Sequence, residues 1–531
     1  MRVWKRRGAH RVRKSLDAKL KWRRPTLMSG AAFCGSSSLL SDAGCGGGSA
    51  KRSSMMPCRH DVLQLDCSPF AELAGFDRPD ARKRLAATTK SGRMLQKSGS
   101  AELEKGAKVE SQTFPGPLVL PHDDLNYDPD GPAQSFKSWL NEKHRNRVTP
   151  GRKTLYVAAV PEVDESVGFM RGWTRVRVDG AGGAPSNGLG KRKMVDGEEN
   201  ERKRAIAEDE EMQSPDVHDV VGYLQAFYHG MHVKQFPQRL RWVPWKEKGR
   251  AATKMNDIPR YVALQYGDRA TRIRARPSPD GVFTAQLNLN DILDAAIAML
   301  PADAYSILLL VDHDIYESEE DDFCCGRAYG GSRIAVVQSA RYTPELDERD
   351  GIEYAHAWPM SHCKAYADAL CGVEDVVPRP ATVSQIRLSK TGPMRAAITA
   401  TSALSSPPTT VEDLRALWLS RIARTASHEL GHCLGMGHCV YYACNMQSTG
   451  GLREDARQPP YLCPVCEAKV GWAVACELQR GGEEDRKNWV MERGKALGEW
   501  CKKWHGVGMW EGLRAWLEAR DKLVGIKALK W

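Results

Sequence analysis

The sequence predicts an α/β fold in which strands form a twisted mixed sheet and helices pack on it. Short runs rich in aliphatic and β-branched residues are typical of strands, and here they alternate with stretches of helical periodicity. The clearest strand-like runs are residues 261–266, 307–311 and 334–337. Alternation of this kind along a chain favours helices layered on a sheet.

Residues 1–110 are predicted to be an extension without stable structure. They are rich in Ser, Gly, Lys and Arg and show no sustained hydrophobic periodicity. Residues 1–24 hold eleven Lys or Arg and a single acid, so most of the formal net charge of +11 lies at this end. The rest of the chain is nearly neutral and lacks the clustered positive field that binding to nucleic acid needs. We therefore expect no nucleic-acid partner.

A main domain is expected over residues 111–476, with order beginning near Phe114. Its first strand is predicted over residues 154–160, where β-branched and aromatic residues stand between turn signals. Gly-rich and charge-rich runs then replace the apolar pattern, which indicates a disordered surface insertion over residues 176–216. A short helix over residues 219–229 follows.

In the middle of this domain, helix, strand and loop signals alternate. Asn290 is placed to cap a helix over residues 291–300. The acidic residues 317–322 and the Gly-rich residues 326–331 are expected only to connect the strands on either side. Residues 383–410 are polar and Pro-rich, which favours a loop.

A longer helix is predicted over residues 411–434, because apolar residues recur there at helical spacing. Thr410 can cap its first turn, with Asp413 three residues later. The end of this helix reads His428-Glu429-Leu430-Gly431-His432. Residues four apart lie on one helical face, about 5–6 Å apart at Cβ, so two imidazoles can reach one metal ion.

The residues that follow complete a three-histidine site. Gly435 can end the helix and turn the backbone through a conformation that most residues avoid. That turn brings His438 toward His428 and His432. Three His ligands leave a fourth position open, which is the arrangement of a catalytic zinc. Glu429 lies beside the first ligand and can act as general base on a water at the metal.

Four cysteines after this motif predict a second, structural zinc. Four residues separate Cys439 from Cys444, and two separate Cys463 from Cys466. Two such pairs supply the four thiolates of a closed tetrahedral site. Disulfides and a redox dithiol are the alternatives that the spacing leaves open. The other cysteines, including Cys324, Cys325, Cys363 and Cys371, are expected to be core or surface thiols.

The run from His428 to Cys466 resembles the motif of the archaemetzincins, a branch of the metzincin metallopeptidases. The resemblance implies a zincin-like domain in which the three His bind a catalytic zinc, Glu429 is the base, and the four Cys bind a structural zinc. It also implies that Met446 lies in a tight turn beneath the catalytic metal. One departure is the loop between Met446 and Cys463, which has sixteen residues here and usually seventeen in the family.

We therefore expect a zinc-dependent metallopeptidase that holds two zinc ions per chain and hydrolyses peptide bonds with a zinc-activated water and Glu429. The alternative is a catalytically silent two-zinc scaffold or binding protein, against which the intact Glu429 argues. A nucleic-acid-binding zinc knuckle is a further alternative, but residues 439–470 mix basic with acidic side chains. No second oxyanion donor can be named, because the nearby tyrosines are expected to pack: Tyr441, Tyr442 and Tyr461.

A smaller C-terminal part is expected after Gly435, ending in a helical, Trp-rich segment over residues 477–531. Packing against the catalytic core is favoured over a membrane or partner surface for its tryptophans: Trp489, Trp500, Trp504, Trp510, Trp516 and Trp531. No apolar run is long enough to span a bilayer, and no secretion signal is visible. We expect an intracellular location, cytoplasmic or nuclear, with a mitochondrial transit peptide over residues 1–55 as the alternative.

Overall fold

The computed structural model of the chain describes residues 58–93, 110–121, 123, 132–177, 212, 214–245, 258–404 and 408–526. The basic residues 1–24, residues 178–211 of the predicted insertion, and Trp531 lie outside the described residues. No helix within the described ranges has the length and apolar content that crossing a membrane requires.

The strands of the described residues form two sheets, and the first has the order β10-β11-β8-β1-β3. All neighbours in it are parallel except β10 and β11, which are antiparallel. Its strands are β1 (Thr154–Ala158), β3 (His232–Gln235), β8 (Ala304–Val311), β10 (Gly326–Tyr329) and β11 (Ile334–Gln338). This confirms the predicted α/β class and the strands expected near residues 154, 307 and 334.

The second sheet has the order β2-β4-β5-β6-β7-β9 within the described residues and is largely antiparallel. Its strands are β2 (Glu162–Val163), β4 (Leu240–Pro244), β5 (Tyr261–Tyr266), β6 (Arg269–Pro277), β7 (Ala285–Asn288) and β9 (Ile315–Tyr316). The predicted strand over residues 261–266 matches β5.

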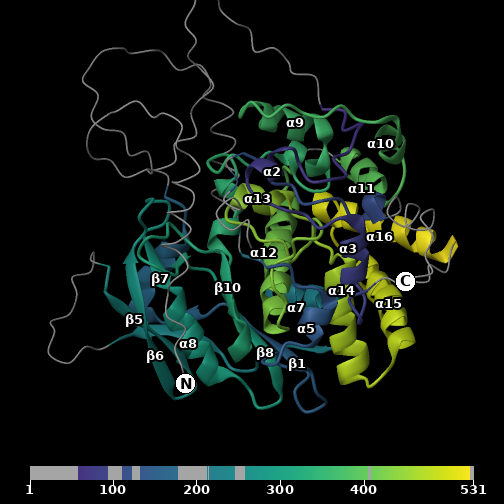
Figure 1. Cartoon of the computed structure of the whole chain (residues 1–531). Coiled ribbons are helices and arrows are strands. Elements are labelled where there is room, and N and C mark those ends of the chain that lie inside the picture. Colours follow the sequence, from purple (N-terminus) through teal and green to yellow (C-terminus); the bar gives the residue numbers. More distant parts are fainter. Residues whose placement is uncertain are drawn as a thin grey trace, which may run out of the picture. The chain divides into compact units, whose positions relative to one another are not determined.

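Strand β8 is buried along its whole length because both faces of the first sheet are covered. Side chains alternate between the two faces of a strand. Accordingly Leu308 and Leu310 pack into one core, while Ile307, Leu309 and Val311 pack into another. Helix α12 (Val411–Cys433) covers the first face together with α7 (Val217–Phe227), and α8 (Leu289–Met299) covers the second. Figure 1 shows α12 between the first sheet and the C-terminal helices.

The described residues form further helices besides these three. They are α2 (Phe70–Leu73), α3 (Ala81–Ala87), α5 (Phe136–Leu140), η2 (Glu165–Thr174), α9 (Lys364–Gly372), α10 (Val383–Leu388), α11 (Pro393–Ser402), α13 (Leu452–Arg457), α14 (Pro464–Gly471), η8 (Trp472–Leu478), α15 (Glu483–Cys501) and α16 (Gly508–Ile526). Short 3₁₀ turns lie at Gly330–Ser332, Ala340–Tyr342, Pro344–Leu346, Tyr354–His356 and Met360–His362.

The Trp-rich C-terminal helices pack on the core, as predicted. Trp489 lies on α15, and Trp510 and Trp516 lie on α16; all three are almost fully buried. The indole N–H of Trp510 donates to the carbonyl of Ala416 on α12 at 3.3 Å. The tryptophans therefore join the C-terminal segment to the central helix.

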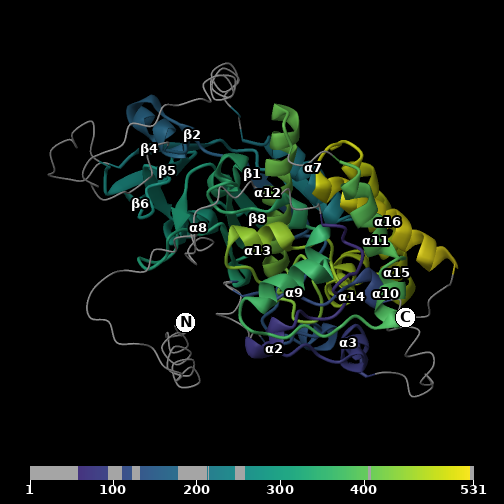
Figure 2. The ribbon, with the colours of Figure 1, turned by 90° about the horizontal axis from the view of Figure 1, so that it is seen from above.

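Part of the predicted N-terminal extension is folded, so that prediction is wrong for residues 58–93. Leu63 and Leu65 are buried in the main core, and Phe70 packs against α9. In Figures 1 and 2, α2 lies beside α9. The apolar runs here are too short to show a sustained helical or strand period, and contact with distant parts of the chain orders them.

Three further sequence predictions are corrected. Residues 326–329 are a strand rather than a connection, because they pair with β11. Residues 383–410 contain α10 and α11, since Met394, Ala397 and Ile398 of α11 are buried in the core. Asn288, not Asn290, caps α8 by accepting from the backbone of Asp291 at 3.1 Å. The amide of Asn290 instead donates to the carbonyl of Glu317.

Candidate metal centre

Helix α12 begins and ends where the sequence predicts. The Thr410 hydroxyl accepts from the backbone N–H of Asp413 at 3.1 Å. At the other end Gly435 has φ +76°, and two bonds close a Schellman turn: Gly435 N–H to the carbonyl of His432 at 2.9 Å, and Met436 N–H to that of Gly431 at 3.1 Å. The left-handed conformation of Gly435 turns the chain back toward the helix.

This turn brings the three predicted histidines together. The ring centroids of His428 and His432 are 4.7 Å apart, and that of His438 lies 5.4 Å from the first and 4.9 Å from the second. One ring nitrogen from each lies within 4.8 Å of the others. The i, i+4 spacing on α12 and the turn at Gly435 together produce the cluster.

Hydrogen bonds fix which nitrogens face the centre of this cluster. The Nδ1–H of His428 donates to the carbonyl of Asn445 at 2.6 Å, and that of His432 donates to the carbonyl of Met436 at 2.7 Å. Each neutral ring therefore keeps a lone pair on Nε2, and these two atoms are 3.0 Å apart. Two facing lone pairs repel unless a cation lies between them, and tetrahedral zinc with Zn–N of about 2.0 Å holds its nitrogens about 3.3 Å apart.

The three rings are also held neutral, which metal binding requires. Burial is the main cause that lowers the pKa of each imidazole. The pKa of His428 falls well below its ordinary value, that of His432 falls to about 4, and that of His438 is also lowered. The like charge that a neighbouring protonated imidazole would carry lowers the pKa of His428 and His432 further. The donor set therefore fits zinc.

Glu429 lies beside the histidines in a cleft of about 920 Å³. Its residue is 7% exposed, and burial raises the pKa of its carboxyl group to about 8. The cleft is lined by all three histidines and by β10, whose Gly326 lies so close that an added Cβ would be 3.3 Å from Glu429 Cγ. The predicted base and the predicted ligands therefore share one cavity.

Met446 packs against the helix at Gly431, a residue that lies between His428 and His432 in the sequence. It stands in a turn closed by a hydrogen bond from Gln447 N–H to the carbonyl of Cys444 at 2.9 Å. A Cβ added to Gly431 would be only 2.5 Å from Met446 Sδ. The same turn supplies the Asn445 carbonyl that orients His428, so it supports the cluster from below.

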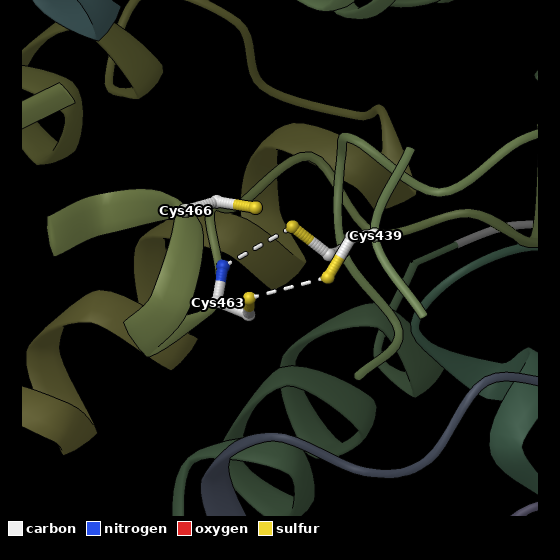
Figure 3. A group of neighbouring side chains, drawn as sticks. Cys439, Cys463 and Cys466 are labelled. Atoms are coloured by element: carbon white, nitrogen blue, oxygen red, sulfur yellow. Dashed lines mark hydrogen bonds between the residues drawn. The ribbon is translucent and has the colours of Figure 1, made fainter. Parts of the chain in front are cut away.

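The four predicted cysteine ligands also converge. The sulfur atoms of Cys439, Cys444, Cys463 and Cys466 all lie within 4.8 Å of one another, and all four residues are buried. Figure 3 shows Cys439, Cys463 and Cys466 directing their sulfur atoms toward a common centre.

The spacing of these thiols fits a metal better than disulfides. Cys439 Sγ is 3.5 Å from Cys463 Sγ, and Cys463 N–H donates to Cys444 Sγ at 3.2 Å. A disulfide needs about 2.05 Å between sulfurs. Zinc with four bonds of about 2.3 Å holds them about 3.8 Å apart. The donor set of four thiols fits a closed tetrahedral zinc.

Sequence reasoning did not identify Arg327, one of several charged residues that line the cleft. It lies on β10, and its charge is the strongest that acts to lower the pKa of Glu429. No motif marks Arg327, because the Gly-rich run around it was assigned to a connection. The three tyrosines expected to pack do so: Tyr441, Tyr442 and Tyr461 are buried and do not line the cleft.

Comparisons with known proteins find similarity to peptidases. The chain matches the family model "Peptidase family M54" over residues 398–471. It is 21% identical over 405 residues to archaemetzincin-2 of Homo sapiens, covering 76% of this chain and 79% of that protein. It is 33% identical over 90 residues to archaemetzincin-2 of Rattus norvegicus, covering 17% and 22%. The solved archaemetzincin of Methanopyrus kandleri is 14% identical, with 61% of this chain and 96% of that chain covered and a TM-score of 0.26.

The stretch matched by the family model contains the three histidines, Glu429 and the four cysteines that the structure brings into two clusters. Two curated archaemetzincins of mammals match the same chain, one of them over most of its length. The chain is therefore a metallopeptidase similar to the archaemetzincins, and its match to the family model lies over residues 398–471.

Proposed function

We propose that this metallopeptidase holds its catalytic zinc with His428, His432 and His438 and uses Glu429 as the general base for peptide hydrolysis. The observation that supports the proposal most strongly is the pair of Nε2 lone pairs held 3.0 Å apart by two backbone carbonyls. When bound, zinc supplies a Lewis acid that polarises the scissile carbonyl and lowers the pKa of water from 15.7 to about 7.

Glu429 is placed to move the proton in this reaction. Its carboxylate is on the same helical turn as His428 and His432 and opens into the same cleft. A base there can accept a proton from the attacking water and pass it to the leaving amine. No other carboxylate lies next to the histidines in the sequence.

Strand β10 forms a wall of the cleft on which an extended peptide can bind. Within the described residues it pairs with β11 on one side and with no strand on the other. The free edge of a sheet offers backbone N–H and C=O groups to a further strand. Arg327, whose side chain is 52% exposed and pairs with Glu317 at 3.3 Å, lies beside that edge. A peptide that adds to β10 would pass the three histidines.

We further propose that Cys439, Cys444, Cys463 and Cys466 hold a second zinc of purely structural role. Four thiolates leave no open position for a water or a substrate. These two clusters would hold one zinc ion each, one with nitrogen ligands and one with sulfur ligands.

The test compares two histidines of the same cleft. Substitution His432→Ala removes a proposed ligand, whereas His144→Ala changes an exposed histidine that lines the cleft outside the cluster. We expect His432→Ala to lose one zinc ion and all cleavage of a peptide library. We expect His144→Ala to keep the zinc content and the cleavage activity of the wild type. Unchanged zinc content and cleavage in His432→Ala would overturn the proposed catalytic site.

A further inference from the structure

A third group of metal-ligand side chains lies apart from the two clusters already described. It consists of Cys58, His60 and Cys363, whose ligand atoms lie within 4.8 Å of one another. The two sulfur atoms are 3.5 Å apart, although 305 residues separate them in the chain. None of the three residues belongs to the catalytic or the structural cluster.

The geometry of this cluster resembles that of the four-cysteine site. The distance between Cys58 Sγ and Cys363 Sγ equals the 3.5 Å between Cys439 Sγ and Cys463 Sγ. Cys363 is the N-cap residue of the nine-residue helix α9, as Cys463 is of α14. Burial raises the pKa of the Cys363 thiol overall to about 11, although the first backbone N–H groups of α9 act to lower it.

His60 supplies a second, independent observation that points to a metal ion. Its residue is 7% exposed, and its Nδ1 is buried without a hydrogen-bond partner among the described residues. Its backbone has φ +49°, a conformation that costs free energy for a non-glycine residue and persists only where the surroundings impose it. Arg395 helps to impose it by donating to the carbonyls of His60 and Asp61 at 2.8 and 2.9 Å.

The surroundings also offer a fourth ligand. The ring centroid of His356 lies 5.5 Å from that of His60, and its Nε2 is likewise buried without a partner among the described residues. The Nδ1 of His356 contacts Glu353 at 3.1 Å, which leaves Nε2 as the free metal-binding atom. His356 is a neighbour of the cluster and not one of the three residues whose ligand atoms all lie within 4.8 Å of one another. Two thiols and one imidazole form a donor set typical of tetrahedral zinc with a fourth position left for a neighbour or water.

We propose that Cys58, His60 and Cys363 bind a third zinc ion, with His356 or water in the fourth position. Binding releases the two thiol protons, and the two thiolates then neutralise the charge of Zn²⁺. The ion would link residues 58–60 to the segment that precedes α9.

The backbone already pairs these two segments. Leu63 forms an antiparallel bridge with Cys363, Gln64 N–H donates to the carbonyl of His362 at 2.9 Å, and Lys364 N–H donates to that of Val62 at 2.9 Å. A metal ion bound by Cys58, His60 and Cys363 would hold the two segments together next to this short backbone pairing. A disulfide between Cys58 and Cys363 would join the same segments but would leave both imidazole nitrogens unsatisfied.

The test measures zinc per chain in the untagged full-length protein, purified under reducing conditions, by elemental analysis and native mass spectrometry. The variants are Cys58→Ser and Cys363→Ser. The control is Cys371→Ser, a buried thiol of the same helix α9 that belongs to no cluster. We expect each of the first two to hold one zinc fewer than the control, and the control to match the wild type.

This difference does not depend on the proposed function, because no substituted residue lies in the histidine or four-cysteine cluster. Equal zinc content in Cys58→Ser, Cys371→Ser and the wild type would overturn the proposal. Cys58 is only half-buried, so its variant gives a result even if Cys363→Ser fails to fold. A Cys58–Cys363 disulfide found by non-reducing peptide mapping of the zinc-loaded protein would also overturn it.

Discussion

At the scale of single residues, Gly431 shows how closely the active-site helix is fitted to the turn beneath it. Its missing side chain lets the Met446 thioether and the Met436 methyl group approach the helix. An added Cβ would lie 2.5 Å from Met446 Sδ and 2.9 Å from Met436 Cε. Both neighbours in contact with Gly431 belong to segments that orient the histidines through backbone carbonyls.

Substitution Gly431→Ala should therefore destabilise the protein by about 1–3 kcal/mol, the usual cost of overpacking a tightly packed core. It should also weaken zinc binding, because the carbonyls that orient His428 and His432 would shift with the turn. The free energy of unfolding in urea and the zinc content after dialysis against a chelator measure the two effects.

Gly498→Ala is the matched control. Gly498 also lies inside a helix, α15, but an added Cβ there meets nothing within 4 Å. Because glycine loses more backbone entropy on folding than alanine does, this substitution should stabilise the protein by roughly 0.5–1 kcal/mol. Equal effects of the two substitutions would show that Met446 does not constrain the helix.

The residues of the three-histidine and four-cysteine clusters could be predicted from the sequence because their spacing is local. The i, i+4 pair, the glycine turn and the two cysteine pairs all fall between His428 and Cys466. Arg327 and the Cys58–His60–Cys363 cluster could not be predicted, because their partners are brought close only by the tertiary fold. A local motif identifies ligands; it does not identify what the fold adds to them.

At the scale of elements, the four-cysteine cluster connects the turn after α12 to the start of α14. Cys439 and Cys444 come from that turn, and Cys463 and Cys466 from the first residues of α14 and the cap before it. The turn also carries Met446 and Asn445, which contact the catalytic helix. We therefore expect loss of zinc from the four-cysteine cluster to displace the three histidines through this turn.

Substitution Cys463→Ser should lower the melting temperature and remove the sulfur-bound zinc, because an opened structural site forfeits metal-binding free energy that stabilises the fold. Cys501→Ser is the control, since Cys501 is a buried thiol of α15 outside every metal cluster of the described residues. We expect the melting temperature of Cys463→Ser to fall well below that of Cys501→Ser. Equal melting temperatures with unchanged zinc content would remove the four-cysteine site from the account.

Strand β10 and helix α11 explain why some elements escaped prediction. The Gly-rich composition around Gly326 is typical of a loop, yet pairing with β11 makes residues 326–329 a strand. Polar residues dominate near α11, yet Met394 and Ile398 reach the core beside α16. In both cases contacts with distant elements outweigh the local preference.

At the scale of the whole chain, the described segment 58–93 belongs to the core and cannot be treated as an appendage. Its buried side chains include Leu63, Leu65, Phe76 and Leu85. Burying a Leu or Phe side chain contributes about 1.5–3 kcal/mol, and a folded protein has a net stability of only about 5–15 kcal/mol. Loss of this segment would remove a large part of that margin.

Deletion of residues 1–57 should leave the melting temperature and the zinc content unchanged, because their composition lacks a burial pattern. Deletion of residues 1–93 should give insoluble or strongly destabilised protein. Soluble yield and thermal unfolding of the two truncated chains provide the comparison. A stable, zinc-loaded product of the longer deletion would show that the packing of Leu63 and Phe76 contributes little.

Peptide hydrolysis in this cleft is proposed to depend on Glu429 as the base of a zinc site whose ligands are the three histidines. Substitution Glu429→Gln tests it most directly, because the amide keeps the shape of the side chain and removes its basicity. Glu142→Gln, an exposed glutamate that lines the same cleft, is the control. Zinc content and cleavage of a peptide library are measured in both variants and in the wild type.

We predict that Glu429→Gln keeps all of its zinc while peptide hydrolysis falls by at least about 10²-fold, the typical contribution of general base catalysis. Glu142→Gln should retain both zinc and hydrolysis. Cleavage by Glu429→Gln at the wild-type rate would contradict Glu429 as the base and favour a zinc-binding scaffold. Loss of the catalytic zinc from Glu429→Gln would show that Glu429 is needed for metal binding rather than for proton transfer.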